Sequence, residues 1–211
     1  MRLLLVLAGL SVLTACAASP RPPGGQPEAL VIAFVDDFHS GVILDRDAVP
    51  VGLLPLGGRS VPAARWVVLH YGERRWIRGE ADGMLDALRL AVLSGEGGVQ
   101  MDLVPWWRHD RGGTEPSRVR LWAFPATQAE VAGVVGRLDS WIADGGAMEV
   151  LAVDSGWWRS SRAWTLTNNC HDFTVDLLAG AGLELSRPPV IQAEGLRVGL
   201  DRAWAERAAG P

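Results

Sequence analysis

Hydrophobic residues along the chain gather in short runs typical of buried strands. Continuous apolar runs at 29–35 and 42–44 flank the polar stretch 36–41, which predicts a β-hairpin. Similar runs predict further strands at 66–70, 75–77, 99–104 and 118–124. Apolar residues at helical spacing predict helices over 82–93, 127–143 and 170–179. This mixture of hairpins and helices predicts an α+β domain.

Two helix starts carry capping signals. Thr127 and Glu130 form the spacing of a capping box, and Asn169 is a good N-cap with Asp172 three residues later. Gly180 marks the end of the second helix. Segments 45–64 and 145–164 lack a regular pattern and are expected to be loops, while 188–198 is expected to add a strand.

The N-terminus has the pattern of a targeting signal. Arg2 precedes an apolar stretch, residues 3–13, that is too short to span a bilayer, which is typical of a signal peptide. The tetrad ending at Cys16 resembles the bacterial lipobox, in which the Cys is lipidated and becomes the new N-terminus. The alternative is an ordinary signal peptide cleaved after Ser19.

The lipoprotein interpretation divides the chain into three parts. Residues 1–15 are the signal peptide, 16–28 are the lipidated Cys16 with a Pro/Gly-rich tether, and 29–205 are a single domain. The expected partner is a lipid bilayer, held through the acyl chains on Cys16. Because no aspartate follows Cys16, we expect an outer-membrane lipoprotein that faces the periplasm of a diderm bacterium.

Composition excludes several function classes. The 211-residue chain has a net charge of −4, which argues against a nucleic-acid partner. All of its basic residues are Arg, so Schiff-base chemistry, a P-loop and a Ser–Lys dyad are excluded. Two Cys are too few for a disulfide scaffold or a multi-thiolate metal site. We therefore expect no cofactor.

Cys170 is the candidate nucleophile. Its place in the first turn of a helix exposes it to the amides and the dipole, which are expected to lower the thiol pKa, although Asp172 opposes this. His39 and His70 end apolar strand runs and are the preferred candidate bases. His171 is less favoured, because adjacent residues on a helix point about 100° apart.

Less specific interpretations of these residues stay open. Most lone Cys residues are inert and buried, and His109 has the surroundings of a loop residue. A zinc site built from His39, His70 and Cys170 lacks any paired-ligand spacing. The doublets Trp106-Trp107 and Trp157-Trp158 fall in loop-like segments, where they line a substrate groove, lie on a membrane interface or cap a small core.

The segments around the candidate residues resemble a known class. Asn169-Cys170-His171-Asp172-Phe173 before Leu177-Leu178-Ala179-Gly180 is similar to the Cys helix of circularly permuted papain-like hydrolases and acyltransferases. Lecithin–retinol acyltransferases and permuted NlpC-type peptidases belong to that class. His39-Ser40-Gly41 resembles its upstream base motif, and His70 resembles its third polar residue.

A second resemblance extends over nearly the whole mature chain. It is to an uncharacterised bacterial lipoprotein family, a domain of unknown function noted near urease genes. The similar stretches are His39-Ser40, His70 to Trp76, and Asn168 to Phe173. His70 stands where that family tends to have Gly, so Glu73 is the alternative third residue.

The resemblances imply an antiparallel sheet packed against the Cys helix, and amide or ester cleavage. Cys170 would attack a carbonyl, His39 would take the thiol proton and His70 would orient His39. The Cys170 N–H, with Asn168 or Asn169, would hold the oxyanion. Peptidoglycan stem peptides and membrane acyl esters are the expected substrate classes.

Two other functions are open. A catalytically inactive papain-like lipoprotein that binds or assembles envelope components would share the fold, and its Cys170 and His39 would not face each other in a cleft. A role in urease nickel handling depends on gene neighbourhood in the similar family, and the four scattered His residues do not support it.

Overall fold

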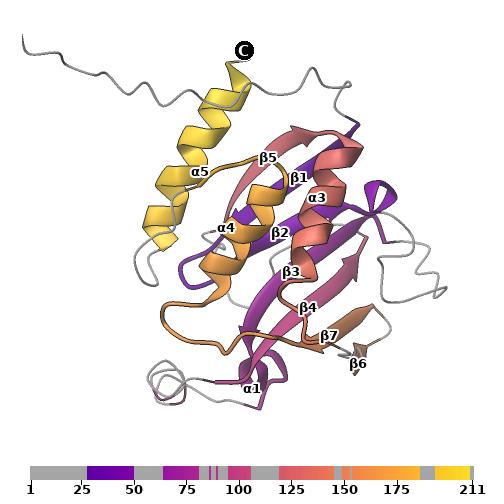
Figure 1. Cartoon of the computed structure of the whole chain (residues 1–211), viewed down its shortest axis with the longest axis vertical. Coiled ribbons are helices and arrows are strands. Elements are labelled where there is room, and N and C mark those ends of the chain that lie inside the picture. The colour runs from indigo at the N-terminus through magenta and orange to yellow at the C-terminus, as the bar shows by residue number, and fades with distance from the viewer. Residues whose placement is uncertain are drawn as a thin grey trace, which may run out of the picture.

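A seven-stranded antiparallel sheet forms the centre of the molecule (Figure 1). The structure is a computed structural model and describes residues 28–49, 64–80, 86, 89, 95–105, 119–144, 149–152, 154–185 and 193–209. The strand order is β5-β1-β2-β3-β4-β7-β6. The strands are β1 (Ala29–Val35), β2 (Ser40–Asp45), β3 (Trp66–Glu73), β4 (Gly97–Val104), β5 (Arg120–Ala126), β6 (Glu149–Ala152) and β7 (Ser155–Arg159).

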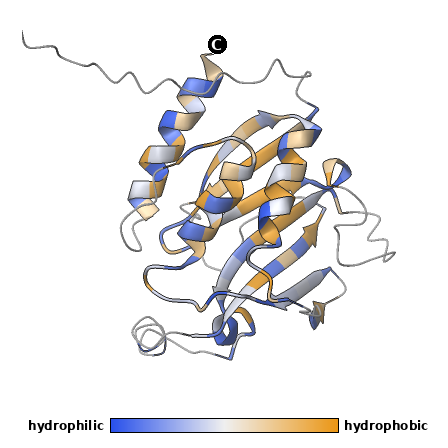
Figure 2. Cartoon of the chain, in the orientation of Figure 1, coloured by the Kyte–Doolittle hydropathy of each residue, from blue (hydrophilic) through white to orange (hydrophobic). Residues whose placement is uncertain are grey.

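Three helices cover one face of this sheet. They are α3 (Gln128–Leu138), α4 (Cys170–Gly180) and α5 (Ala193–Ala208). In Figure 1, α3 and α4 lie in front of the strands, and α5 lies at the side of the sheet, where it contacts β5 and β1. The strands and α3 carry most of the hydrophobic colour in Figure 2, whereas α5 is largely hydrophilic. The main core therefore lies between the sheet and these helices. None of the described helices is long and apolar enough to cross a membrane.

Side chains alternate between the two faces of the sheet, as the strand period requires. On β3, Val67, Leu69 and Tyr71 belong to the core under the helices, and we call this side the helix face. Val68 belongs instead to a smaller cluster with Phe34 and Ile43 on the opposite side, which we call the far face. The mixed α+β architecture therefore has two faces with different surroundings.

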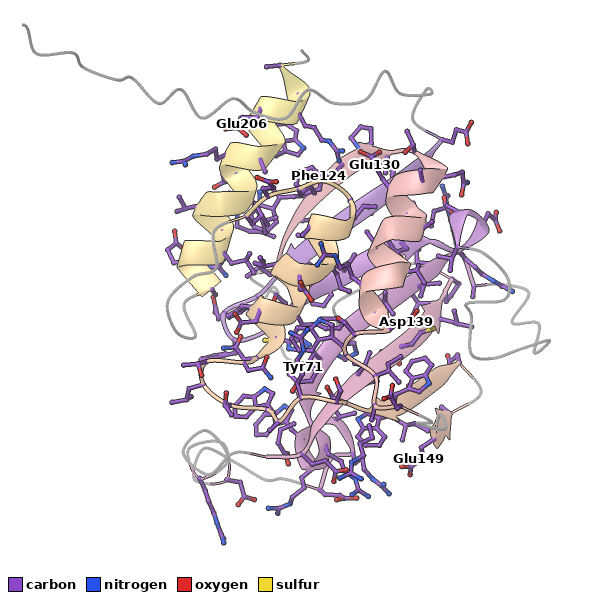
Figure 3. All side chains as sticks on the ribbon, viewed as in Figure 1. Tyr71, Phe124, Glu130, Asp139, Glu149 and Glu206 are labelled. Carbon is purple, nitrogen blue, oxygen red and sulfur yellow. The ribbon has the colours of Figure 1, made fainter. Side chains whose placement is uncertain are left out.

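An aromatic cluster fixes α4 on the helix face. The Tyr71 ring lies 4.9 Å from that of Trp141 and 5.8 Å from that of Phe173, measured between centroids. Tyr71 is labelled in Figure 3, below the first turns of α4. Its hydroxyl donates to the carbonyl of Arg162 at 2.9 Å, so the polar end of the buried ring is satisfied. This packing sets the position of the α4 N-terminus over β2 and β3.

Glycines let α3 and α4 approach closely. A Cβ on Gly133 would lie 2.2 Å from the carbonyl oxygen of Gly180, and one on Gly180 would lie 2.4 Å from that of Gly133. Larger residues at either position would force the helices apart. The close approach holds α4 against its neighbour along its C-terminal half.

Most predicted elements are confirmed, with shifted ends. The hairpin is β1 and β2, and the predicted strands at 66–70, 99–104 and 118–124 correspond to β3, β4 and β5. The two capped helices are α3 and α4, and both capping boxes are present. The helix predicted to reach 143 ends at Leu138.

Three predictions are wrong. Residues 75–77 are not a strand but part of α1 (Arg74–Ile77), because the Glu73 carboxylate accepts the Trp76 N–H and caps a helical turn. Segment 145–164 contains β6 and β7, because hydrogen bonds to β4 override its weak local pattern. Segment 188–198 adds no strand where it is described, since α5 begins at Ala193 and buries Leu196 and Leu200 at helical spacing.

The Trp157-Trp158 doublet lies in β7, with one ring on each face. Trp158 is part of the main core, and Trp157, which pairs with Gln100, lies on the far face; both are buried. The predicted loop 45–64 includes a short 3-10 helix, η1 (Arg46–Ala48).

Several predictions lie outside the described residues. They concern Cys16, the signal peptide, Trp106, Trp107, His109 and most of the helix predicted at 82–93.

Candidate functional site

The site begins at the turn between β1 and β2. The Asp36 carboxylate accepts the backbone N–H of Phe38 at 2.7 Å and also that of His39, and the Asp36 N–H donates to the His39 carbonyl at 2.8 Å. Asp side chains stabilise tight turns through such bonds. The turn therefore holds the backbone of Phe38 and His39 in a fixed position where β2 starts.

His39, His70 and Asp102 form a chain of hydrogen bonds. Nε2 of His39 lies 2.9 Å from Nδ1 of His70, and Nε2 of His70 lies 3.1 Å from Oδ2 of Asp102. His70 and Asp102 alternate with helix-face residues of β3 and β4, so they belong to the far face. We call this set the His–His–Asp chain.

The carboxylate at the end of this chain is well supported. Gln100 Nε2 lies 3.0 and 3.1 Å from the two Asp102 oxygens, and Ser155 on β7 also bonds to the carboxylate. Burial raises the pKa of Asp102, but the hydrogen bond and charge of His70, with the bonds from Ser155 and Gln100, outweigh burial and lower it overall. Asp102 is therefore ionised at neutral pH.

Cys170 is the first residue of α4, as predicted. The Asn169 side chain caps the helix by accepting the His171 N–H at 2.8 Å, and Asp172 accepts the Asn169 N–H at 3.2 Å. The amide nitrogen of Asn169 donates to the Leu166 carbonyl at 2.8 Å. The cap therefore fixes both the position of Cys170 and the loop before it.

The Cys170 sulfur lies at the start of β2. Sγ is 3.8 Å from the carbonyl oxygen of Phe38, the residue before His39, and 3.9 Å from Nδ1 of His171. The Cys170 side chain is buried, and burial raises the pKa of its thiol to about 11. The expectation of a lowered pKa is therefore wrong, because the desolvation of a buried thiolate outweighs the helix amides.

Ser40 joins β2 to the first turn of α4. Its hydroxyl lies 3.1 Å from the Cys170 carbonyl, 2.9 Å from Nδ1 of His171 and 2.9 Å from Oγ1 of Thr174. Thr174 also donates to the Cys170 carbonyl at 2.8 Å. These buried contacts tie the candidate nucleophile to the strand that follows His39.

His171 is closer to the sulfur than its sequence position suggested. Adjacent residues leave the helix axis about 100° apart at Cα, but their side chains can still bend toward the same point. Here the side chains of Cys170 and His171 both turn toward the start of β2. Burial lowers the pKa of His171, so its ring is neutral at neutral pH. The expectation that His171 points away from Cys170 is therefore wrong.

The remaining predicted residues have local structural contacts. Glu73 caps α1, three residues along β3 from His70 and on the opposite face. Asn168 donates from its amide to the Ala163 carbonyl at 2.6 Å. Asn169 is occupied by the cap. Glu73, Asn168 and Asn169 are therefore held by contacts other than those of the His–His–Asp chain.

Sequence analysis missed Asp102, Gln100 and Ser155. A signal was present, because Gln100 and Asp102 are spaced two residues apart in an otherwise apolar strand and must share a face. The strand register, which pairs His70 with Gln100, could not be obtained from the sequence alone.

Within the described part of the chain, no group of three or more His, Cys, Asp and Glu side chains is arranged to hold a metal ion. Comparison of the chain with protein-family models, with curated proteins and with solved structures finds no match.

Proposed function

We propose that the protein is a membrane-anchored cysteine hydrolase or acyltransferase of the cell envelope with a permuted papain-like fold. Cys170 attacks the carbonyl carbon of an amide or an ester. The observation that supports this most strongly is the 3.8 Å contact between Sγ and the carbonyl oxygen of Phe38. This contact places the thiol against Phe38, the residue before His39. His39 is the first member of the His–His–Asp chain.

The buried thiol determines how the proton moves. With a pKa of about 11, Cys170 is protonated at neutral pH, so a preformed thiolate is not the resting state. The S–H bond therefore breaks as the C–S bond forms, and His39 takes the proton as general base. His39 then protonates the leaving amine or alcohol. Water, or an acceptor alcohol or amine, cleaves the thioester and frees Cys170.

The backbone N–H of Cys170 is the proposed oxyanion donor. Asn168 and Asn169 use their side-chain amides in bonds to the carbonyls of Ala163 and Leu166. The His171 N–H is bonded to the Asn169 cap. A single oxyanion donor contributes about 10²–10³ in rate.

An exposed aromatic side chain on Phe38, the residue whose carbonyl oxygen contacts the sulfur, favours an ester with an apolar acyl group. Phe38 is 85% exposed, although the Asp36 bonds hold its backbone rigidly. Contact with an acyl chain would remove this ring from water, at about 25 cal/mol per Å² of apolar surface. We therefore place membrane acyl esters ahead of peptidoglycan stem peptides as substrates.

The test is the capture of an acyl-enzyme on Cys170. The full chain in detergent is mixed with p-nitrophenyl esters of short and long acyl chains and with a stem-peptide amide, then acid-quenched for intact mass. We expect one acyl group per chain with the long ester, none in Cys170→Ala, and hydrolysis lowered by about 10²–10⁴ in His39→Gln. Glu73→Gln is the control, and it is expected to retain hydrolysis.

Burial of Cys170 favours a second candidate function, a non-catalytic lipoprotein that binds envelope components. That function predicts no acyl adduct with any substrate. It also predicts that the pH dependence of Cys170 alkylation is the same in the wild type and in His39→Gln. If both hold, the hydrolase proposal is wrong.

A further inference from the structure

We infer that Ser40 stabilises the sulfur of Cys170 when it carries negative charge, through the backbone N–H and the hydroxyl of Ser40. This role deepens the proposed function and rests on it, because the sulfur becomes negatively charged when Cys170 gives up its proton and again when the thioester is cleaved. Ser40 is fully buried and directly follows His39 where β2 begins. Its hydroxyl bonds to the first turn of α4, so one residue joins the strand of the candidate base to the helix of the nucleophile.

The surroundings of the sulfur do not by themselves favour a thiolate. Sγ contacts the carbonyl oxygen of Phe38, which can only accept hydrogen bonds, and Nδ1 of His171. Burial lowers the pKa of His171, so this ring carries no charge at neutral pH. Burial is also the largest cause of the raised pKa of Cys170, and the negative charge of Asp36 raises it further. A thiolate at this position therefore needs hydrogen-bond donors.

The backbone N–H of Ser40 is the first donor. The Asp36 N–H bonds to the His39 carbonyl, so these residues form a hydrogen-bonded pair at the start of the β1–β2 ladder. Because hydrogen-bonded and non-bonded pairs alternate along an antiparallel ladder, the next pair is non-bonded and the Ser40 N–H points away from β1. The pairing of β2 with β3 begins only at Gly41. The Ser40 N–H is thus available to the sulfur, and its hydrogen bond lowers the pKa of Cys170.

The Ser40 hydroxyl is the second donor. Its oxygen lies 3.1 Å from the Cys170 carbonyl and 2.9 Å from Nδ1 of His171, the atom that also contacts Sγ. The Cys170 carbonyl accepts a further bond from the Thr174 hydroxyl at 2.8 Å, so it keeps a partner when the Ser40 O–H rotates toward the sulfur. A hydrogen bond from this hydroxyl also lowers the pKa of the thiol.

The two donors act at two steps of the proposed reaction. As the thiol proton moves to His39, the negative charge left on Sγ is held by the N–H and the O–H of Ser40, and hydrogen bonds to a charged atom are the strong ones. When water or an acceptor alcohol cleaves the thioester, the C–S bond breaks and the sulfur leaves with the electron pair. The same donors hold this charge until His39 returns a proton to the sulfur. Ser40 therefore assists both acylation and deacylation.

The first test is the rate at which iodoacetamide alkylates Cys170 in the folded full chain, measured by peptide mass. Alkylation requires the thiolate, so Ser40→Ala should slow it about tenfold at each pH between about 7 and 9. Ser160→Ala is the matched control, because Ser160 is also a buried serine that donates to a backbone carbonyl, that of Trp141, and its loss should not slow alkylation. A purely structural effect has the opposite sign, since a less stable protein opens more often and exposes the thiol.

The second test needs no Ser40 variant. The amide nitrogen resonance of Ser40 should move as Cys170 ionises between about pH 8 and 10, and should stay in place in Cys170→Ala. Alkylation of Ser40→Ala as fast as that of the wild type, or a Ser40 amide that does not respond to the ionisation of Cys170, would overturn the inference. Failure of the proposed function looks different: both tests give the expected result, but Cys170 forms no acyl adduct with any substrate.

Discussion

The buried thiol of Cys170 predicts that the protein loses stability at alkaline pH. Its folded-state pKa of about 11 is above the unfolded value of 9.0. Above the unfolded value, the unfolded chain releases a proton that the folded chain keeps. The stabilising contribution is therefore complete below about pH 9 and is lost as the pH rises toward 11.

The composition of the chain makes this effect measurable. There is no Lys, and Tyr71 is the only Tyr, so few groups titrate between pH 8 and 11. From about pH 7.5 to pH 10, Cys170 alone should raise the unfolding equilibrium constant roughly tenfold, which is about 1.4 kcal/mol. Burial also raises the pKa of Tyr71, and this adds a smaller loss of the same sign.

The assay is urea unfolding followed by tryptophan fluorescence at a series of pH values, on the full chain in detergent. Cys170→Ala removes buried atoms, so it should lower the free energy of unfolding at neutral pH. It should also make the free energy of unfolding decrease less between pH 8 and 10, because the buried thiol is gone. Tyr71→Phe separates the tyrosine contribution. If Cys170→Ala falls as steeply as the wild type between pH 8 and 10, the burial argument is refuted.

Two further predictions concern packing. Gly133→Ala should lower the free energy of unfolding by about 1–3 kcal/mol through its clash with Gly180, whereas Gly136→Ala, with open space around its Cβ, should raise it by up to about 1 kcal/mol. If both substitutions change the free energy of unfolding in the same direction, the close contact between α3 and α4 is refuted. The buried Trp157 N–H has no hydrogen-bond partner within the described part of the chain, so Trp157→Phe should cost less than about 1 kcal/mol in urea unfolding. A loss above about 2 kcal/mol would contradict this prediction.

Elements with a strong local signal were predictable from the sequence. The capping boxes at Thr127 and Asn169 located the starts of α3 and α4, and the apolar runs located the central strands. Segments whose structure depends on partners were not. β7 is a strand because β4 pairs with it, and its sequence, rich in Ser, Gly and Trp, carries no clear alternation.

The candidate site shows the same division. The strand ends pointed to His39 and His70, and the structure places their rings in contact. Asp102 could be assigned to the site only once the strand register was known, because the register determines which side chains of β3 and β4 lie opposite each other. The pKa of Cys170 could not be predicted either, because it depends on burial by β2 rather than on the position of Cys170 in its helix.

The sheet order also has a consequence for how the chain folds. β1 pairs with β5, so Ala29 pairs with Ala126, a residue far away in the sequence. Ser40 contacts Cys170, which is 130 residues further along the chain. Contacts of such long sequence separation form slowly, because closing large loops costs entropy before any bond is gained. The β1–β2 hairpin can form early, but its helix face is exposed until α4 arrives. We therefore expect folding to be slow, the site to be completed last, and chains truncated before α4 to aggregate.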